Sequence, residues 1–211
     1  MAYDFKKEEK KYYLPKRKPE IIAIPAMKFI AVSGQGDPNK PDGDYQKALS
    51  QLYTLAYTIK MSKLGDHRMA GYFDFVVPPL EGLWWQKGKG EVDFQNKDDF
   101  EWISMIRIPD FVNEQELEWA KNQALAKKKV DCSDVNLLEM AEGLCAQILH
   151  VGPYDDEPAT IQILDSYIRQ QGFVLDLNEK RHHHEMYLSD PRRTAPEKLK
   201  TVIRHPIRKA D

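Results

Sequence analysis

The sequence of 211 residues has only two cysteines, Cys132 and Cys145, and no long apolar run. Two thiols are too few for a disulfide framework or a four-cysteine zinc site, so we expect free thiols in a reducing compartment. No segment approaches the roughly 18 apolar residues of a membrane span, and the N-terminus has no signal-peptide core. The sequence therefore predicts a cytoplasmic protein, with Cys145 as a buried small hydrophobe rather than a nucleophile.

An excess of positive charge is also missing. The chain has 31 Lys and Arg against 33 Asp and Glu, a formal net charge of −2. This balance gives no field that would hold nucleic acid or an anionic membrane. Its one basic block, residues 6–19, could touch an acidic partner, but we interpret it as a solvated arm that leads into the first strand.

Hydrophobic patterning predicts strands interspersed with helices, and therefore the α+β class. Helices are expected at 44–59, 113–129 and 155–171, with Asp44 as the N-cap of the first. Asn113 and Glu116 form a capping box for the second helix. Strands are expected at 20–32, 72–77, 80–86, 100–108, 143–151, 173–177, 183–188 and 199–207.

The order strand, glycine, helix, strand, strand occurs twice, which indicates a diverged internal duplication. The segment Met105–Pro109 matches Val202–Pro206. We predict a single domain with an arm at 1–20, a first module at 21–110, a connector helix at 113–129 and a second module at 141–208. Two such modules would pair about a pseudo-twofold axis and leave a ligand cleft between them.

The run from His182 to Glu185 invites comparison with a metal site, since imidazole and carboxylate are common ligands. Consecutive strand residues point to opposite faces, so His183, Glu185 and Tyr187 share one face and His184 the other. We therefore predict no metal, and exposed strand histidines instead. Gly34 and Gly36 lack the third glycine of a dinucleotide fingerprint, so no cofactor is predicted either.

Glu185 lies in the middle of a strand whose other face is apolar. In a cleft, desolvation would raise its pKa and suit it to act as a general base, or as the counter-charge of a cationic guest. The alternative is a surface strand with its polar residues in solvent. The pattern alone leaves both interpretations open.

Trp84 and Trp85 lie on opposite sides of one predicted strand, and Trp102 lies on the strand expected to neighbour it. One indole of the pair must leave the core face. Indole rings in a cleft offer flat surfaces on which a planar or cationic ligand can stack. Their alternative role is to fill the core.

Several short motifs, in this order, resemble the GyrI-like small-molecule-binding family. They are Lys18–Glu20, Pro41–Lys60, Pro79–Trp85, His150–Tyr154 with Glu157, His184–Pro191 and Thr201–Pro206. Together they span nearly the whole chain. More narrowly, the chain resembles stand-alone bacterial members of the family, some of which are cyclopropanoid cyclopropyl hydrolases.

The resemblance implies two strand-helix-strand-strand modules and a cleft for hydrophobic, often cationic or planar aromatic compounds. Glu185 matches the acidic residue of that cleft. Regulators of the family carry a DNA-binding helix-turn-helix module that the first 20 residues cannot contain, so we expect no direct nucleic-acid binding.

We therefore expect a hydrolase or binding protein for planar aromatic xenobiotics. Glu185 would act on water, and Tyr187 or Tyr154 would hydrogen-bond the developing phenolate. The expected ligand-binding residues are Trp84, Trp85, Trp102, Met105 and His183, with Glu81 as the reserve acid. The alternatives are a non-catalytic binder that sequesters drugs or acts through a protein partner, and an adaptor that inhibits an enzyme such as gyrase.

Overall fold

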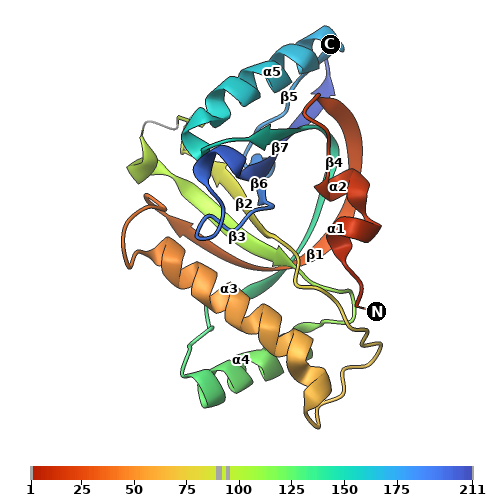
Figure 1. Ribbon diagram of the computed structural model, residues 1–211, viewed down its shortest axis with the longest axis vertical. Helices are drawn as coiled ribbons and strands as arrows, with labels where there is room; N and C mark the ends of the chain where they lie inside the picture. Colours follow the sequence, from red (N-terminus) through yellow and green to blue (C-terminus); the bar gives the residue numbers. More distant parts are fainter. Residues whose placement is uncertain (1, 89–91, 94–95, 211) are drawn as a thin grey trace.

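The chain forms one seven-stranded antiparallel sheet with few helices, as the computed structural model shows for residues 2–88, 92–93 and 96–210 (Figure 1). The strand order is β4-β1-β3-β2-β6-β7-β5, and β4 also pairs with β7, so the sheet closes like a barrel. The strands are β1 Glu20–Gln35, β2 Leu80–Trp85, β3 Glu101–Arg107, β4 Asn136–Val151, β5 Phe173–Leu175, β6 His183–Tyr187 and β7 Lys200–Lys209. This architecture confirms the α+β class.

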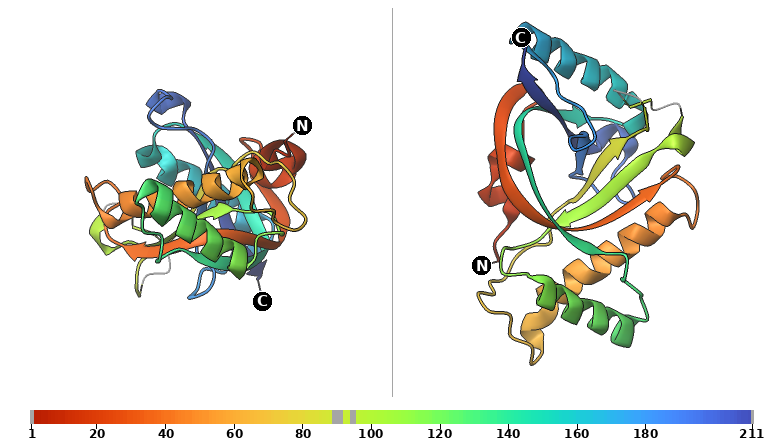
Figure 2. Two further views of the ribbon diagram at one scale, coloured as in Figure 1. Left: turned by 90° about the horizontal axis from the view of Figure 1, so that it is seen from below. Right: turned by 180° about the vertical axis from the view of Figure 1, so that it is seen from behind.

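The two longest strands, β1 and β4, curve together along one side of the sheet (Figure 2). Their ladder lacks the pair at Pro25, which has no amide to donate, and Gly143 beside this gap has a positive φ of 68°. Because pairing resumes beyond it, β4 begins at Asn136 and not at the predicted Gly143. Strand β7 likewise continues through Pro206, which pairs with Cys145.

Two helices, α3 (Asp44–Lys60) and α5 (Glu157–Gln170), cover the same side of the sheet, which we call the helix face. Helix α3 contacts β1 and β3, and α4 (Glu114–Lys128) packs beside α3. Helix α5 buries Leu164 and Ile168 against Ile148 and Ile203. Short 3₁₀ helices lie at η1 Met61–Leu64, η2 Lys97–Asp99, η3 Tyr154–Asp156 and η4 Pro196–Lys198. Within the described ranges, no helix has the length and apolarity needed to cross a bilayer.

Two local predictions are wrong. The N-cap of α3 is Gly43, and Asp44 is already the first helical residue. The predicted strand at 72–77 is absent, and only Phe75 forms an isolated bridge, to Tyr3. Pro78 and Pro79 follow this segment and cannot donate to a ladder, so it does not continue into β2 as a strand. The cap of α4 is confirmed in part, since Asn113 accepts the amide of Glu116 at 3.0 Å.

The N-terminal arm is not the solvated segment that its charge predicts. It forms two single-turn helices, α1 (Phe5–Glu8) and α2 (Lys10–Tyr13), and Tyr13 is only 1% exposed. The Tyr13 hydroxyl donates to Glu81 on the side of the sheet opposite the helix face, which we call the arm face. Aromatic residues inside the basic run fold this segment onto the sheet, because their burial outweighs the solvation of the lysines around them.

Beneath the arm, the arm face buries a network of four charged side chains. His184 bonds Glu81 at 3.0 Å and Glu142 at 2.9 Å, and Arg204 donates to Glu142 at 2.6 Å. Burial alone would lower the pKa of His184, but the charge and hydrogen bond of Glu142, and then those of Glu81, raise it to about 9. Burial alone would raise the pKa of Glu142, but His184 and Arg204 lower it to about 2. Two cations and two anions therefore balance inside the fold.

This network predicts a specific pH dependence of stability. Because the pKa of His184 rises from 6.5 to about 9 on folding, its contribution is complete below pH 6.5 and is lost as the pH rises through 9. The free energy of unfolding should fall over this window by up to about 3 kcal/mol. Denaturant titrations of the wild-type protein and His184→Gln measure it, and the variant should lack this fall. Parallel pH profiles would contradict the account.

Candidate functional site

Glu185 lies at the centre of the helix face, on a strand that pairs with β2 on one side and β7 on the other. The predicted alternation is confirmed, since His183 and Tyr187 contact Glu185 on this face while His184 joins the network on the arm face. Glu185 is only 6% exposed. It is therefore not in bulk solvent, and the surface-strand interpretation is wrong.

Two donors hold the Glu185 carboxylate. His183 Nε2 lies 2.8 Å from Oε1, and the Tyr187 hydroxyl donates to Oε2 at 2.6 Å. Trp84 Nε1 in turn donates to the Tyr187 hydroxyl oxygen at 2.9 Å. Burial acts to raise the pKa of Glu185, but the hydrogen bond and charge of His183, followed by Tyr187, lower it below its ordinary value. Glu185 is therefore an ionised carboxylate that is almost fully buried from solvent.

A second carboxyl group, Glu157, approaches Glu185 from the start of α5. It is 1% exposed, and its burial together with the negative charge of Glu185 raises its pKa well above its ordinary value. The raised pKa of Glu157 beside the lowered pKa of Glu185 assigns the proton of this interacting pair to Glu157. Sequence reasoning missed this role, although Glu157 belongs to one of the motifs that carry the family resemblance.

Aromatic rings form a wall beside the carboxyl pair. Trp84 and Trp102 are cross-strand partners in the β2–β3 ladder, and the Tyr45 ring of α3 contacts both indoles, at centroid distances of 5.5 and 5.2 Å. Glycines make room for this wall. A Cβ at Gly34 would lie 2.3 Å from the Trp102 ring, and a Cβ at Gly82 would lie 2.7 Å from Trp84 Nε1. The glycine that resembled a weak nucleotide motif therefore serves indole packing.

The phenols around the site remain protonated in the physiological range. Burial, reinforced by Glu185, raises the pKa of Tyr187 and Tyr45 well above 10. Burial, followed by the charges of Glu157 and Glu185, raises the pKa of Tyr154 to about 12. The Tyr154 ring meets the Tyr187 ring edge-on at 5.8 Å and is 36% exposed, so it lies where the site meets solvent. These hydroxyls can donate hydrogen bonds to an oxyanion.

The structure divides the predicted site residues between the two faces. Glu185, Tyr187, Tyr154, His183, Trp84 and Trp102 come together on the helix face. Glu81, Met105 and Trp85 point to the arm face, where Trp85 stacks on His182 at 4.1 Å and donates to Glu101. Because side chains alternate along a strand, these three residues lie on the opposite face of the sheet from Glu185.

The prediction of exposed strand histidines is also wrong. His183 is 2% and His184 0% exposed, and each is bonded to a carboxylate. Burial of Cys145 is confirmed, and burial followed by the charge of Glu142 raises its thiol pKa to about 12. Such a thiol is not a nucleophile at neutral pH.

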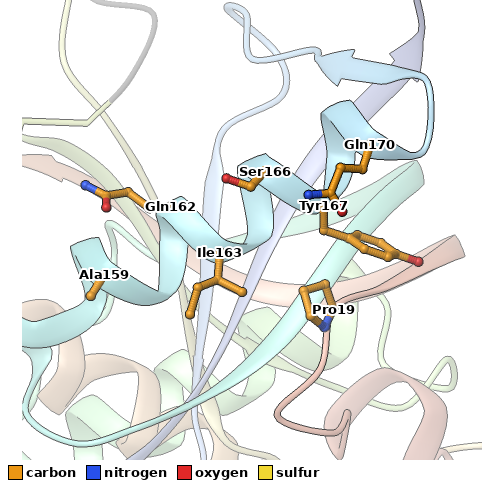
Figure 3. A pocket seen from close by; sticks show the side chains of 7 residues that line it. All are labelled: Pro19, Ala159, Gln162, Ile163, Ser166, Tyr167 and Gln170. Atoms are coloured by element: carbon orange, nitrogen blue, oxygen red, sulfur yellow. The ribbon is translucent and has the colours of Figure 1, made fainter.

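A groove of about 500 Å³ lies outside this site, along the outer side of α5 (Figure 3). It is lined by Pro19, Ala159, Gln162, Ile163, Ser166, Tyr167 and Gln170. None of the predicted site residues lines it. The ligand cleft expected between the two modules stays a prediction.

Residues 17–208 match the family model of the GyrI-like small molecule binding domain. The chain belongs to the GyrI-like family. The match spans both helices of the helix face and nearly all of the sheet, including Glu185. No curated protein matches this GyrI-like chain.

Solved structures from Listeria innocua are similar over almost the full length. One, described as a hydrolase, is 49% identical with a TM-score of 0.89, and the match covers 98% of this chain and 100% of that one. Another, described as an uncharacterized conserved protein, is 51% identical with a TM-score of 0.92 over the same shares. The C-terminal domain of EcmrR, at 12% identity, a TM-score of 0.55 and coverage of 92% and 98%, shares the GyrI-like fold alone.

Proposed function

We propose that this GyrI-like protein binds planar aromatic compounds on the helix face and hydrolyses those that carry an electrophilic cyclopropane ring. The observation that carries the proposal is the ionised, nearly buried carboxylate of Glu185 beside an aromatic wall. The description of relatives at 49% and 50% identity as hydrolases also supports it.

Glu185 is the general base in this proposal. A carboxylate offers about four lone-pair sites. Hydrogen bonds from His183 and Tyr187 leave lone-pair sites of the carboxylate free to take a water proton. The water oxygen bonds to a ring carbon as a strained carbon–carbon bond breaks. The electron pair of that bond moves through the conjugated system to the carbonyl oxygen, which becomes a phenolate. A returned proton makes the product equal to substrate plus water.

The protonated phenols of Tyr187 and Tyr154 would stabilise the phenolate. Trp84 and Trp102 would flank the aromatic framework of the substrate, and Tyr45 and Tyr154 must move aside to admit it, because the Tyr45 ring contacts both indoles. The exposed edge of Tyr154 makes it the first side chain that an entering ligand would meet. Ligand entry is thus coupled to motion of two tyrosines.

We also propose that the two modules are related by a pseudo-twofold axis. The pairing order β1-β3-β2 in the first half is repeated as β4-β7-β6 in the second, and the halves join through β1 with β4 and β2 with β6. Glu185 and Trp84 then lie on the two strands that meet at the axis. The family resemblance implies a ligand cleft at this junction of β2 and β6.

A non-catalytic binder that sequesters ligands or acts through a protein partner is the second candidate. With Glu157 protonated, Glu185 would remain an anion, and its negative charge would attract a cationic ring that stacks on Trp84. Such a protein would bind the same compounds and release them unchanged. The two candidates therefore differ in turnover and not in ligand class.

Replacing the base separates these candidates. Incubation of wild-type protein with a duocarmycin-type cyclopropane should yield a product heavier by one water, detected by mass spectrometry. Glu185→Gln should lower the rate at least about 100-fold, because one general base typically contributes that much, and should retain binding. Glu139→Gln, at an exposed position of β4, is the control. Unchanged ligand recovered from tight wild-type complexes would overturn the hydrolase.

The indole pair of β2 tests where the ligand binds. Trp84 and Trp85 are adjacent in sequence but lie on opposite faces. Trp84→Phe should weaken binding of a planar aromatic ligand about tenfold, since it removes stacking area and the bond to Tyr187. Trp85→Phe should change it less than about twofold. Titration calorimetry measures both, and equal losses would place the ligand elsewhere.

A further inference from the structure

A chain of hydrogen bonds leads from Glu185 to helix α5. His183 Nε2 lies 2.8 Å from Glu185 Oε1, and His183 Nδ1 lies 2.7 Å from His205 Nε2. His205 Nδ1 lies 3.1 Å from Asp165 Oδ1. Both histidines are buried, whereas 13% of the Asp165 side chain is exposed. The chain thus joins β6, β7 and α5, and its outer end reaches solvent.

The hydrogens that these three hydrogen bonds require determine the net charge of the four side chains. Each of the three contacts needs one hydrogen between the two atoms, and neither carboxylate supplies one when ionised. Two neutral imidazoles carry only two hydrogens. With Glu185 and Asp165 both ionised, one of the two rings must therefore hold an additional proton and a positive charge. The only other way to supply the third hydrogen is to protonate an end carboxylate.

We propose that Asp165 and His205 are positioning residues that keep one positive charge on the His183–His205 ring pair beside Glu185. This inference rests on the proposed function only for the use of Glu185 as a base. Asp165 and His205 act on Glu185 through His183, which lies between it and His205. Sequence reasoning could not find them, because β7 and α5 meet only in the fold.

An amide at the outer end of the chain removes the need for the positive charge. In Asp165→Asn, the new side-chain amide nitrogen would supply the third hydrogen to His205 Nδ1, His205 would donate to His183, and a neutral His183 would donate to Glu185. Glu185 would keep its hydrogen bond and lose its neighbouring cation. Its pKa should then rise, because an opposite charge at this distance lowers a carboxyl pKa by about 1 to 3 units.

Among the described residues, four other titratable groups interact with Glu185 from the surrounding elements. They are Tyr45 of α3, Tyr154 of η3, Glu157 of α5 and Tyr187 of β6. The pKa values of the three phenols are raised above 10, so the phenols do not titrate between about pH 5 and 9. Glu157 is the protonated member of the carboxyl pair, since its pKa is raised well above its ordinary value. The contacts among His183, His205 and Asp165 are thus the part of the site that Asp165→Asn changes.

The first test reads the charge directly and needs no turnover. ¹⁵N NMR of the histidine rings of wild-type protein near neutral pH should show both nitrogens protonated in one ring, or shared between the rings, of the His183 and His205 pair. In Asp165→Asn both rings should be neutral. Two neutral rings in wild type would overturn the proposal, and so would a cation that persists in Asp165→Asn. The wild-type spectrum decides even if the variant fails to fold.

The second test is the pH profile of hydrolysis. In Asp165→Asn, the decline of the hydrolysis rate at acid pH should begin about one pH unit higher than in wild type. The variant should therefore be about tenfold slower than wild type at low pH and within about twofold of it at high pH. Asp165→Glu should restore the wild-type profile, and Glu179→Gln, in an exposed loop, should leave it unchanged. A uniform fall at every pH would indicate a merely structural role and overturn the proposal. Absence of wild-type turnover would contradict the proposed function, while the NMR result would still decide the charge.

Discussion

Glu185 is a charged group that is only 6% exposed, and the surrounding elements supply what its burial requires. An unpaired buried carboxylate is unstable, so it must gain donors and a counter-charge or take up a proton. Tyr187 and His183 provide the donors, and the raised pKa of Glu157 removes the competing charge. Strands β6 and β7 and helix α5 are therefore coupled to one carboxylate.

Strand β6 divides the charges of the sheet between two faces. His184 lies one residue before Glu185, yet it is held between Glu81 and Glu142 on the arm face, where cations and anions balance. On the helix face, the same strand places Glu185 against an aromatic wall and leaves it ionised. A one-residue shift in register would exchange these two settings, so the pairing of β6 with β2 and β7 positions the site. The arm contributes by covering the first network through Tyr13.

Alternation along a strand is local, and that part of the site could be predicted from the sequence. It placed His183, Glu185 and Tyr187 on one face and separated Trp84 from Trp85. The approach of Glu157 and Asp165 could not be predicted, because it depends on how α5 packs across β4 and β7. The arm was mispredicted for a related reason, since its lysines dominate its composition while Tyr12 and Tyr13 determine its packing. A cytoplasmic location and the lack of nucleic-acid binding stay predictions.

The central claim is that ligands bind on the helix face, against Glu185 and Trp84. A crystal structure of Glu185→Gln with a bound duocarmycin-type cyclopropane tests it most directly. We expect the aromatic framework against Trp84 and Trp102, with Tyr45 and Tyr154 displaced and the ring carbon facing residue 185. A ligand seated instead in the groove along α5, with Tyr45 still against the indoles, would contradict the account.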